Sequence, residues 1–239
     1  MSYWVKKGLK TGVVSTHYPK QEETARGITP GLPQITDDAN SDDLVFVCPT
    51  KAIHKTDEKL LLDSSLCIHC YRCSRDTKEP LPWSEGFEWA SFEKKSTPFS
   101  STFGHSLHIC VVDSGDCGAC LNETKLLNSP LYNMHRLGFF ITPSPRKADI
   151  LLVVGAVTEQ MKGALLKAYE AMPTPKKVMA VGTCALSGGV FEGGFIAENG
   201  VSSILPVDIT VPGCPPPPLA ILHGLLSLAG RKNIKRGAK

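Results

Sequence analysis

Eight of the nine cysteines in this 239-residue chain fall into two groups of four, a pattern that in a reducing compartment indicates metal binding. The first group comprises Cys48, Cys67, Cys70 and Cys73. The second group comprises Cys117, Cys120, Cys184 and Cys214. Four thiolates can hold one Zn²⁺ ion or one [4Fe–4S] cluster. Spacing must therefore decide which of the two chemistries each group favours.

The first group matches half of a two-cluster ferredoxin. In such ferredoxins each cluster takes the Cys-Pro of one cysteine run and the CxxCxxC of the other. Cys48-Pro49 and the later CIHCYRC of residues 67–73 supply one such set, and the ligands of the other cluster are missing on both sides. The spacing predicts a ferredoxin-like unit reduced to a single [4Fe–4S] cluster, with residues 52–63 as a hairpin. Zinc is the alternative for these four cysteines.

The second half of the chain alternates between strand and helix patterns. Apolar runs predict strands at residues 105–113, 139–145, 148–157, 176–184 and 207–214. A helix with i, i+3, i+4 spacing is expected to begin after Thr158, and a closing helix to end at Gly230. This alternation predicts an α/β fold in which helices cover both faces of a parallel sheet.

The second cysteine group follows three of these strands. Cys117 and Cys120 come after the first strand, Cys184 comes after the strand at 176–184, and Cys214 comes after the last. Because the carboxyl ends of parallel strands share one edge, we expect four thiolates to meet there. One CxxC pair with two distant cysteines matches zinc ribbons poorly. The pattern favours a [4Fe–4S] cluster over zinc or unrelated buried thiols.

Four segments carry a resemblance to a known family: DCGACLNE, TPSPRKADILLVVGAVTEQM, GTCALSGGVF and VPGCPPPP. In this order they resemble the small electron-transfer subunit of membrane-bound group 4 [NiFe]-hydrogenases and formate hydrogenlyase, a family that includes the 20-kDa-type subunit of respiratory complex I. The resemblance runs from about Ser106 to Gly230. It implies a flavodoxin-like fold whose [4Fe–4S] cluster, on the second cysteine group, lies nearest a catalytic large subunit. The opening KKGLKTGVVSTHYPK resembles ferredoxin-type subunits of formate hydrogenlyase, so the chain resembles a fusion of two subunits.

Two positions distinguish branches of this family. Gly118 and Ala119 separate cysteines that are adjacent in complex I subunits, which favours the hydrogenase side. Leu121 stands where the hydrogenase-type motif usually has an acidic residue, and Glu123 matches a Glu of the family. Glu123 is therefore a candidate proton relay, with a solvated or capping carboxylate as the alternative. A partner that has lost its nickel site, or a complex-I-like complex, is the second interpretation.

The remaining residues suggest no active site of their own. With 42% hydrophobic and 21% charged residues the chain is typical of a soluble protein with a core. Five of its positive charges lie in residues 231–239, so nothing indicates nucleic-acid binding. The sequence has no P-loop, no GxGxxG and no nucleophile–base pair. We expect His54 and His69 at the surface and Cys110 in the core.

Together these features predict an electron-relay subunit with two [4Fe–4S] clusters. Its partners would be a separate catalytic large subunit and further iron–sulfur and membrane subunits. Without an apolar run of about 18 residues or a signal peptide, the chain is expected in the cytoplasm, peripheral on the inner face of the membrane through partner subunits. A zinc-stabilised binding protein and a stand-alone ferredoxin are the competing classes. The expected organisation is an extended arm at 1–44, a ferredoxin-like unit at 45–80, a connector at 81–104, a flavodoxin-like domain at 105–230 and a basic tail at 231–239.

Overall fold

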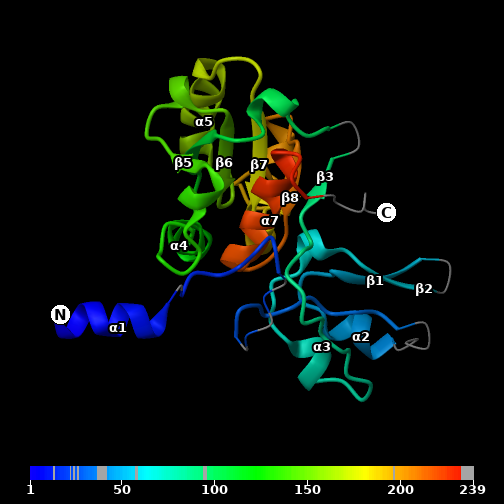
Figure 1. The fold of residues 1–239 in the computed structure, drawn as a ribbon. Helices are drawn as coiled ribbons and strands as arrows, with labels where there is room; N and C mark the ends of the chain where they lie inside the picture. Colours follow the sequence, from blue (N-terminus) through cyan, green and yellow to red (C-terminus); the bar gives the residue numbers. More distant parts are fainter. Residues whose placement is uncertain are drawn as a thin grey trace.

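The chain forms a sheet domain with a smaller unit beside it, and a separate N-terminal helix, α1 (Tyr3–Thr11), extends away from both (Figure 1). The computed structural model describes residues 1–12, 14–21, 23, 25, 27–36, 42–56, 59–93, 96–195 and 197–232. The expected basic tail lies outside the described residues from residue 233 onward.

The sheet domain is built on six strands in the order β3-β8-β7-β6-β4-β5. The strands are β3 (Ser91–Phe92), β4 (Leu107–Asp113), β5 (Phe139–Ile141), β6 (Ile150–Val154), β7 (Lys177–Val181) and β8 (Ile209–Val211). All pairs are parallel except β3 with β8, where Ser91 lies opposite Thr210. The five parallel strands follow the flavodoxin-like order 2-1-3-4-5. This confirms the expected α/β fold with a mostly parallel sheet.

Helices cover both faces of this sheet. They are α4 (Ala119–Leu126), α5 (Glu159–Ala171), α6 (Thr183–Ser187) and α7 (Pro218–Leu228). Leu152 and Val154 of β6 belong to the same buried cluster as α7, whereas Leu151 and Val153 pack with Leu165 of α5. Every residue of β6 and of α7 is buried. Apolar residues are thus needed on both faces of the central strand, as in other parallel sheets.

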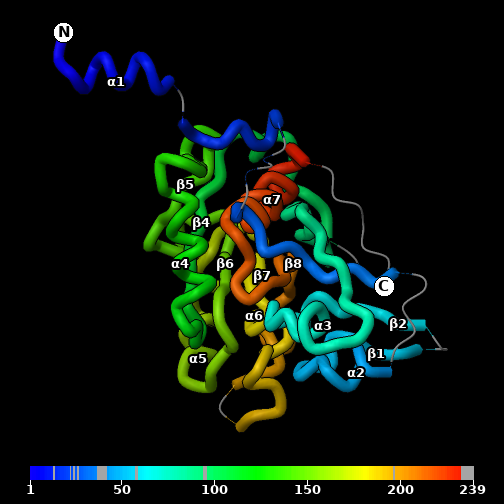
Figure 2. The backbone as a smooth tube through the Cα atoms, turned by 90° about the horizontal axis from the view of Figure 1, so that it is seen from below, coloured from blue at the N-terminus to red at the C-terminus, as the bar shows by residue number. Residues whose placement is uncertain are grey.

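The smaller unit surrounds a short hairpin (Figure 2). It contains α2 (Asp42–Val47), β1 (Ile53–Thr56), β2 (Lys59–Leu62), the 3₁₀ turn η1 (Ser64–Leu66) and α3 (Arg72–Arg75). The strands β1 and β2 pair antiparallel with Ile53 opposite Leu62, which confirms the expected hairpin. Leu44, Leu60 and Leu81 pack with Ile53 in a small apolar core.

The rest of the chain contains further 3₁₀ turns: η2 (Ser101–Phe103), η3 (Met134–Leu137), η4 (Pro145–Lys147), η5 (Gly189–Phe191) and η6 (Val201–Ser203).

Two expectations for the first hundred residues were wrong in part. The segment 1–44, expected to be extended, contains α1 and the start of α2. The connector at 81–104, which shows no clear period, supplies the edge strand β3.

The core position of Cys110 is confirmed, since its side chain is buried with β6 and β7. Among the described residues, no helix combines the length and the apolar character needed to cross a bilayer.

We predict that buried His223 makes the fold acid-sensitive. It lies in α7, only 3% exposed, and burial lowers its pKa to about 4. The unfolded chain protonates this imidazole near pH 6.5. The full free energy of unfolding is therefore present above about pH 6.5, where His223 is neutral in both states. As the pH falls toward about 4, protonation of His223 in the unfolded chain lowers this free energy by up to about 3 kcal/mol. The midpoint of urea unfolding should fall less steeply over this range in His223→Gln than in the wild type.

The exposed His105 provides the matched control. We expect His105→Gln to keep the wild-type slope of unfolding midpoint against pH. Equal slopes in the wild type and in His223→Gln would contradict the assignment.

Candidate functional site

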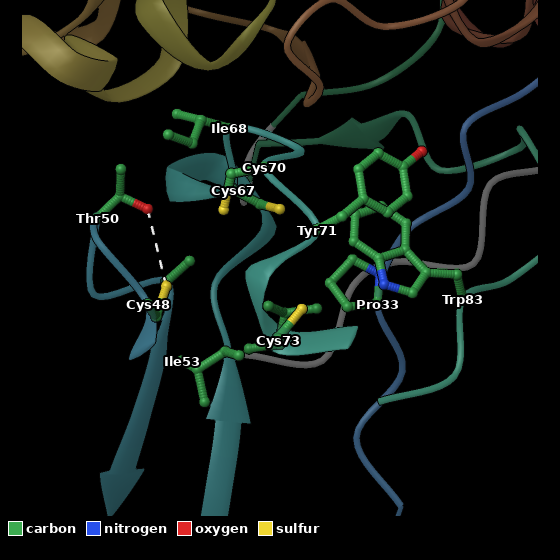
Figure 3. Close-up of a pocket in the computed structure, with 12 residues that line it drawn as sticks. Pro33, Cys48, Thr50, Ile53, Cys67, Ile68, Cys70, Tyr71, Cys73 and Trp83 are labelled. Atoms are coloured by element: carbon green, nitrogen blue, oxygen red, sulfur yellow. Dashed lines mark hydrogen bonds between the residues drawn. The ribbon is translucent and has the colours of Figure 1, made fainter. Parts of the chain in front are cut away.

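The four cysteines of the first group line a single pocket in the smaller unit (Figure 3). Cys48 follows α2, Cys67 and Cys70 lie in the loop after η1, and Cys73 is in α3. The rest of the lining is largely apolar: Pro33, Thr50, Ala52, Ile53, Leu62, Ile68, Tyr71 and Trp83. The structure thus brings together all four residues that the spacing singled out, in a pocket with little access to water.

The four thiols around this pocket influence one another's pKa values. The pKa of the Cys67 thiol is raised to about 11, mainly by burial, with smaller contributions from negative charge on Cys73, Cys48 and Cys70. Burial also raises the pKa of Cys73, with Cys70 and Cys48 adding to the effect. Thiols in such surroundings stay protonated unless a bound cation takes them as ligands. A bound cationic group that took these thiols as ligands would offset the negative charge of their thiolates.

The loop that carries Cys67 and Cys70 has an uncommon backbone. His69 and Tyr71 adopt the left-handed region, with φ of 51° and 60°. The Tyr71 ring stacks on Trp83 with 4.0 Å between ring centroids, and its hydroxyl donates to the Pro30 carbonyl. These contacts hold the loop so that Cys67 and Cys70 both face the pocket (Figure 3).

His69 is not at the surface as expected. Its side chain is buried, with Trp83 and Trp89 edge-on at 5.7 and 6.4 Å between ring centroids. Burial lowers its pKa to about 4, and its Nε2 has no hydrogen-bond partner among the described residues. The expectation was wrong because Trp83 and Trp89 belong to the connector. The connector lies against this loop only in the folded chain, so the local sequence around His69 does not indicate the contact.

The second group lies at the carboxyl edge of the sheet, as predicted. Cys117 and Cys120 follow β4, Cys184 lies in α6 directly after β7, and Cys214 follows β8. Asp113 shapes the first of these loops, because its carboxylate accepts hydrogen bonds from the amides of Gly115 and Asp116, at 3.0 and 2.8 Å.

These four thiols are also coupled to one another. The pKa of Cys120 is raised, and that of Cys184 is raised to about 11, in both cases mainly by burial. Negative charges on Cys214 and Cys117 contribute to both shifts. The pKa of Cys214 is raised by burial and by Cys117. The loops after β4, β7 and β8 bring all four predicted residues to the same edge of the sheet.

Asp116 also lies beside this group, although cysteine spacing alone does not indicate a role for it. Its carboxylate accepts hydrogen bonds from the amides of Gly118 and Leu121, at 2.9 and 3.0 Å, next to the N-terminus of α4. Its charge raises the pKa of Cys120, Cys184 and Cys214. The sequence feature that could have pointed to Asp116 is its position directly before the CxxC pair. Its carboxylate thus adds a negative charge to the surroundings of these thiols.

Glycines leave room for these sulfurs. At Gly182, with φ of +89°, an added Cβ would lie 2.4 Å from the Cys120 Sγ. At Gly189, with φ of +59°, it would lie 2.9 Å from the Cys184 Sγ. Only glycine tolerates both this backbone and this closeness.

In the part of the chain that the structure describes, no three Cys, His, Asp or Glu side chains are arranged to hold a single metal ion.

Helix α6 joins the two groups. The Thr183 hydroxyl donates to the carbonyl of Cys67 at 2.8 Å, and the Ser187 hydroxyl donates to the carbonyl of Ser65 at 3.0 Å. Thr183 directly precedes Cys184 of the second group. A hydrogen bond thus connects the backbone of one cysteine group to the segment that carries the other. Sequence spacing gave no signal for this contact.

Glu123 lines a hollow of about 420 Å³ between the two groups. The lining also includes His69, Tyr71, Tyr132 and Cys214. Burial raises the pKa of Glu123, and burial followed by the Glu123 charge raises that of Tyr132. A carboxyl of this kind takes up and releases protons at a higher pH than a solvated one. Its position is compatible with the expected relay, which stays a prediction.

Comparison with known proteins identifies the family. The family described as NADH ubiquinone oxidoreductase, 20 Kd subunit, matches residues 117–228, which hold the second cysteine group but not the first. Protein MJ0516 of Methanocaldococcus jannaschii is 44% identical over 52% of this chain and 83% of its own length. The probable membrane-bound hydrogenase subunit mbhJ of Pyrococcus furiosus is 41% identical over 56% of this chain and 80% of its own length.

Formate hydrogenlyase subunit 7 of Escherichia coli is 42% identical over 52% of this chain. The match spans about half of that relative, 49% of its length. The resemblance inferred from the four sequence segments is thereby confirmed. The chain belongs to the family of the 20 kDa subunit of NADH–ubiquinone oxidoreductase.

Proposed function

We propose that this chain is the electron-transfer subunit of a group 4 [NiFe]-hydrogenase-like, formate hydrogenlyase-like complex. The observation that carries the proposal is the two sets of four cysteines, one lining a single pocket and the other at the carboxyl edge of the sheet, joined through α6. The second set would hold one [4Fe–4S] cluster and the first set another, within a ferredoxin-like unit. When bound, these clusters supply one-electron chemistry.

The residues around the two sets have distinct tasks in this proposal. Apolar walls and the stacked Tyr71 and Trp83 exclude water from the first set. Asp116 and the glycines around α6 shape the second set. Cys117 is exposed, so that edge is where a catalytic large subunit would dock. Glu123, half-buried beside it, would hold a proton on this path.

The relatives named as hydrogenase and formate hydrogenlyase subunits, together with the spaced CxxC pair, favour a hydrogen-handling partner. The family description favours a second candidate, a complex-I-like oxidoreductase or a related complex without nickel. Nickel measured in the purified complex separates the two. Other iron–sulfur and membrane subunits would complete either assembly and hold this chain at the inner face of the cytoplasmic membrane.

The metal content of anaerobically purified chain is the first test. We expect about eight iron and about eight sulfide per chain. Cys67→Ser and Cys184→Ser should each retain about four iron, because each removes a ligand of one set only. Cys110→Ser, in the core between the sheet and α5, serves as the control and should retain the full content. Zinc without iron would refute the electron-transfer function.

A second test uses the space that glycine leaves at the second set. Gly182→Ala places a Cβ against the Cys120 Sγ on an unfavourable backbone, so about four of the eight iron atoms should be lost. Gly163→Ala is the matched control, since nothing lies within 4 Å of its added Cβ in α5. A full iron content in Gly182→Ala would argue against this geometry.

A third test concerns the junction between the two sets. Thr183→Val removes the hydroxyl that donates to the Cys67 carbonyl and keeps the shape of the side chain. Amide hydrogen exchange of residues 64–67 should quicken about fivefold, as the loss of one hydrogen bond of about 1 kcal/mol implies. Thr210→Val removes a hydroxyl at the β3–β8 edge and should leave that exchange unchanged. Unaltered exchange in Thr183→Val would exclude a stabilising role for the bond.

A further inference from the structure

Helix α1 has no buried residue and extends away from the rest of the described chain in both views (Figures 1 and 2). Its large apolar side chains are open to solvent, with Tyr3 70%, Trp4 73% and Leu9 74% exposed. The sheet domain buries most of its large apolar residues, although Val190, Phe191 and Phe195 are also exposed. Such exposure of aromatic residues on one short element marks a surface that binds something.

The two sides of α1 differ in chemistry. Trp4, Val5 and Leu9 gather on one side around the helix axis. Lys6, Lys7 and Lys10 lie on the other side. Residues 1–21 include no Asp or Glu, so this basic character is not offset locally. The Lys7 ammonium lies 5.5 Å from the centre of the Trp4 ring, so its stem runs along the boundary between the two sides.

A helix of this length needs support from outside itself. It has 9 residues, and helices shorter than about 12 residues are marginal in water. Most helical stability in proteins comes from packing of the apolar side, and α1 has no such packing in the described chain. A surface that covers Trp4 and Leu9 would supply it.

We propose that α1 binds directly to an anionic lipid surface. Short helices with aromatic and aliphatic residues on one side and lysines on the other lie in the plane of the membrane interface. Trp4 would sit at headgroup level, with Val5 and Leu9 below it, whereas Tyr3 lies on the lysine side. The three lysines would face acidic headgroups, which match their charge. A protein groove would cover the apolar side, but it would not account for the three lysines on the other side.

This inference goes beyond the proposed function, in which partner subunits alone hold the chain at the membrane. The test is flotation of the full chain, purified anaerobically, with lipid vesicles. Vesicles of phosphatidylglycerol and phosphatidylcholine in equal parts should carry the chain upward. Pure phosphatidylcholine vesicles should not, and high salt should release the chain from the anionic ones.

Substitutions assign the binding to the two sides of α1. The triple variant Lys6→Gln, Lys7→Gln, Lys10→Gln should lower the partition coefficient about tenfold or more. The control Arg146→Gln, Lys147→Gln, Lys167→Gln changes the net charge equally at exposed positions and should bind like the wild type. On the apolar side, Trp4→Ser with Leu9→Ser should weaken binding, whereas Phe195→Ser, at a side chain 92% exposed, should not.

Iron content is measured on the same samples. It should stay unchanged in every variant, because α1 contacts neither cysteine group. Equal binding to neutral and anionic vesicles would overturn the proposal, as would an equal loss in the control triple variant. Absence of binding to both kinds of vesicle would also overturn it and would assign α1 to a protein partner. None of these outcomes depends on whether the clusters transfer electrons.

Discussion

Parallel pairing of β4, β6, β7 and β8 forces the carboxyl ends of these strands to one edge, and the second cysteine group depends on this constraint. The central strand β6 is buried on both faces, so apolar packing on either side holds it in the middle of the sheet. That burial fixes where the loops after β4, β7 and β8 begin. The sulfurs are therefore positioned by a core that has no chemical role of its own.

The connector does more than span the distance between the two units. Trp89, two residues before β3, donates from its indole nitrogen to the carbonyl of Pro212 at 2.8 Å and also packs against His69. Pro212 directly precedes the Gly213–Cys214 segment of the second group. One side chain thus contacts the loop of the first group and the segment that carries a ligand candidate of the second. With the hydroxyl bonds of α6, it gives the two units a shared, ordered boundary.

Features with a strong local signal were predictable from sequence. The apolar run of β6, the spacing in α5 and the hairpin at 52–63 depend on residues near one another in the chain. The edge strand β3 has two residues and exists only through its partner β8, so no periodicity could reveal it. Burial of His69 likewise depends on distant tryptophans. In α1 the amphipathic pattern was present, but a neighbouring stretch rich in Pro, Thr and Asp obscured it.

Both cysteine groups belong to one polypeptide, and this has a consequence for any exchange between them. Two separate proteins would have to meet by diffusion, at a rate set by their concentrations. Here the partner site is always present at a high effective concentration, because the connector and the Thr183 bond keep it in place. Dilution cannot separate the two sites, and every assembled complex receives them in a one-to-one ratio.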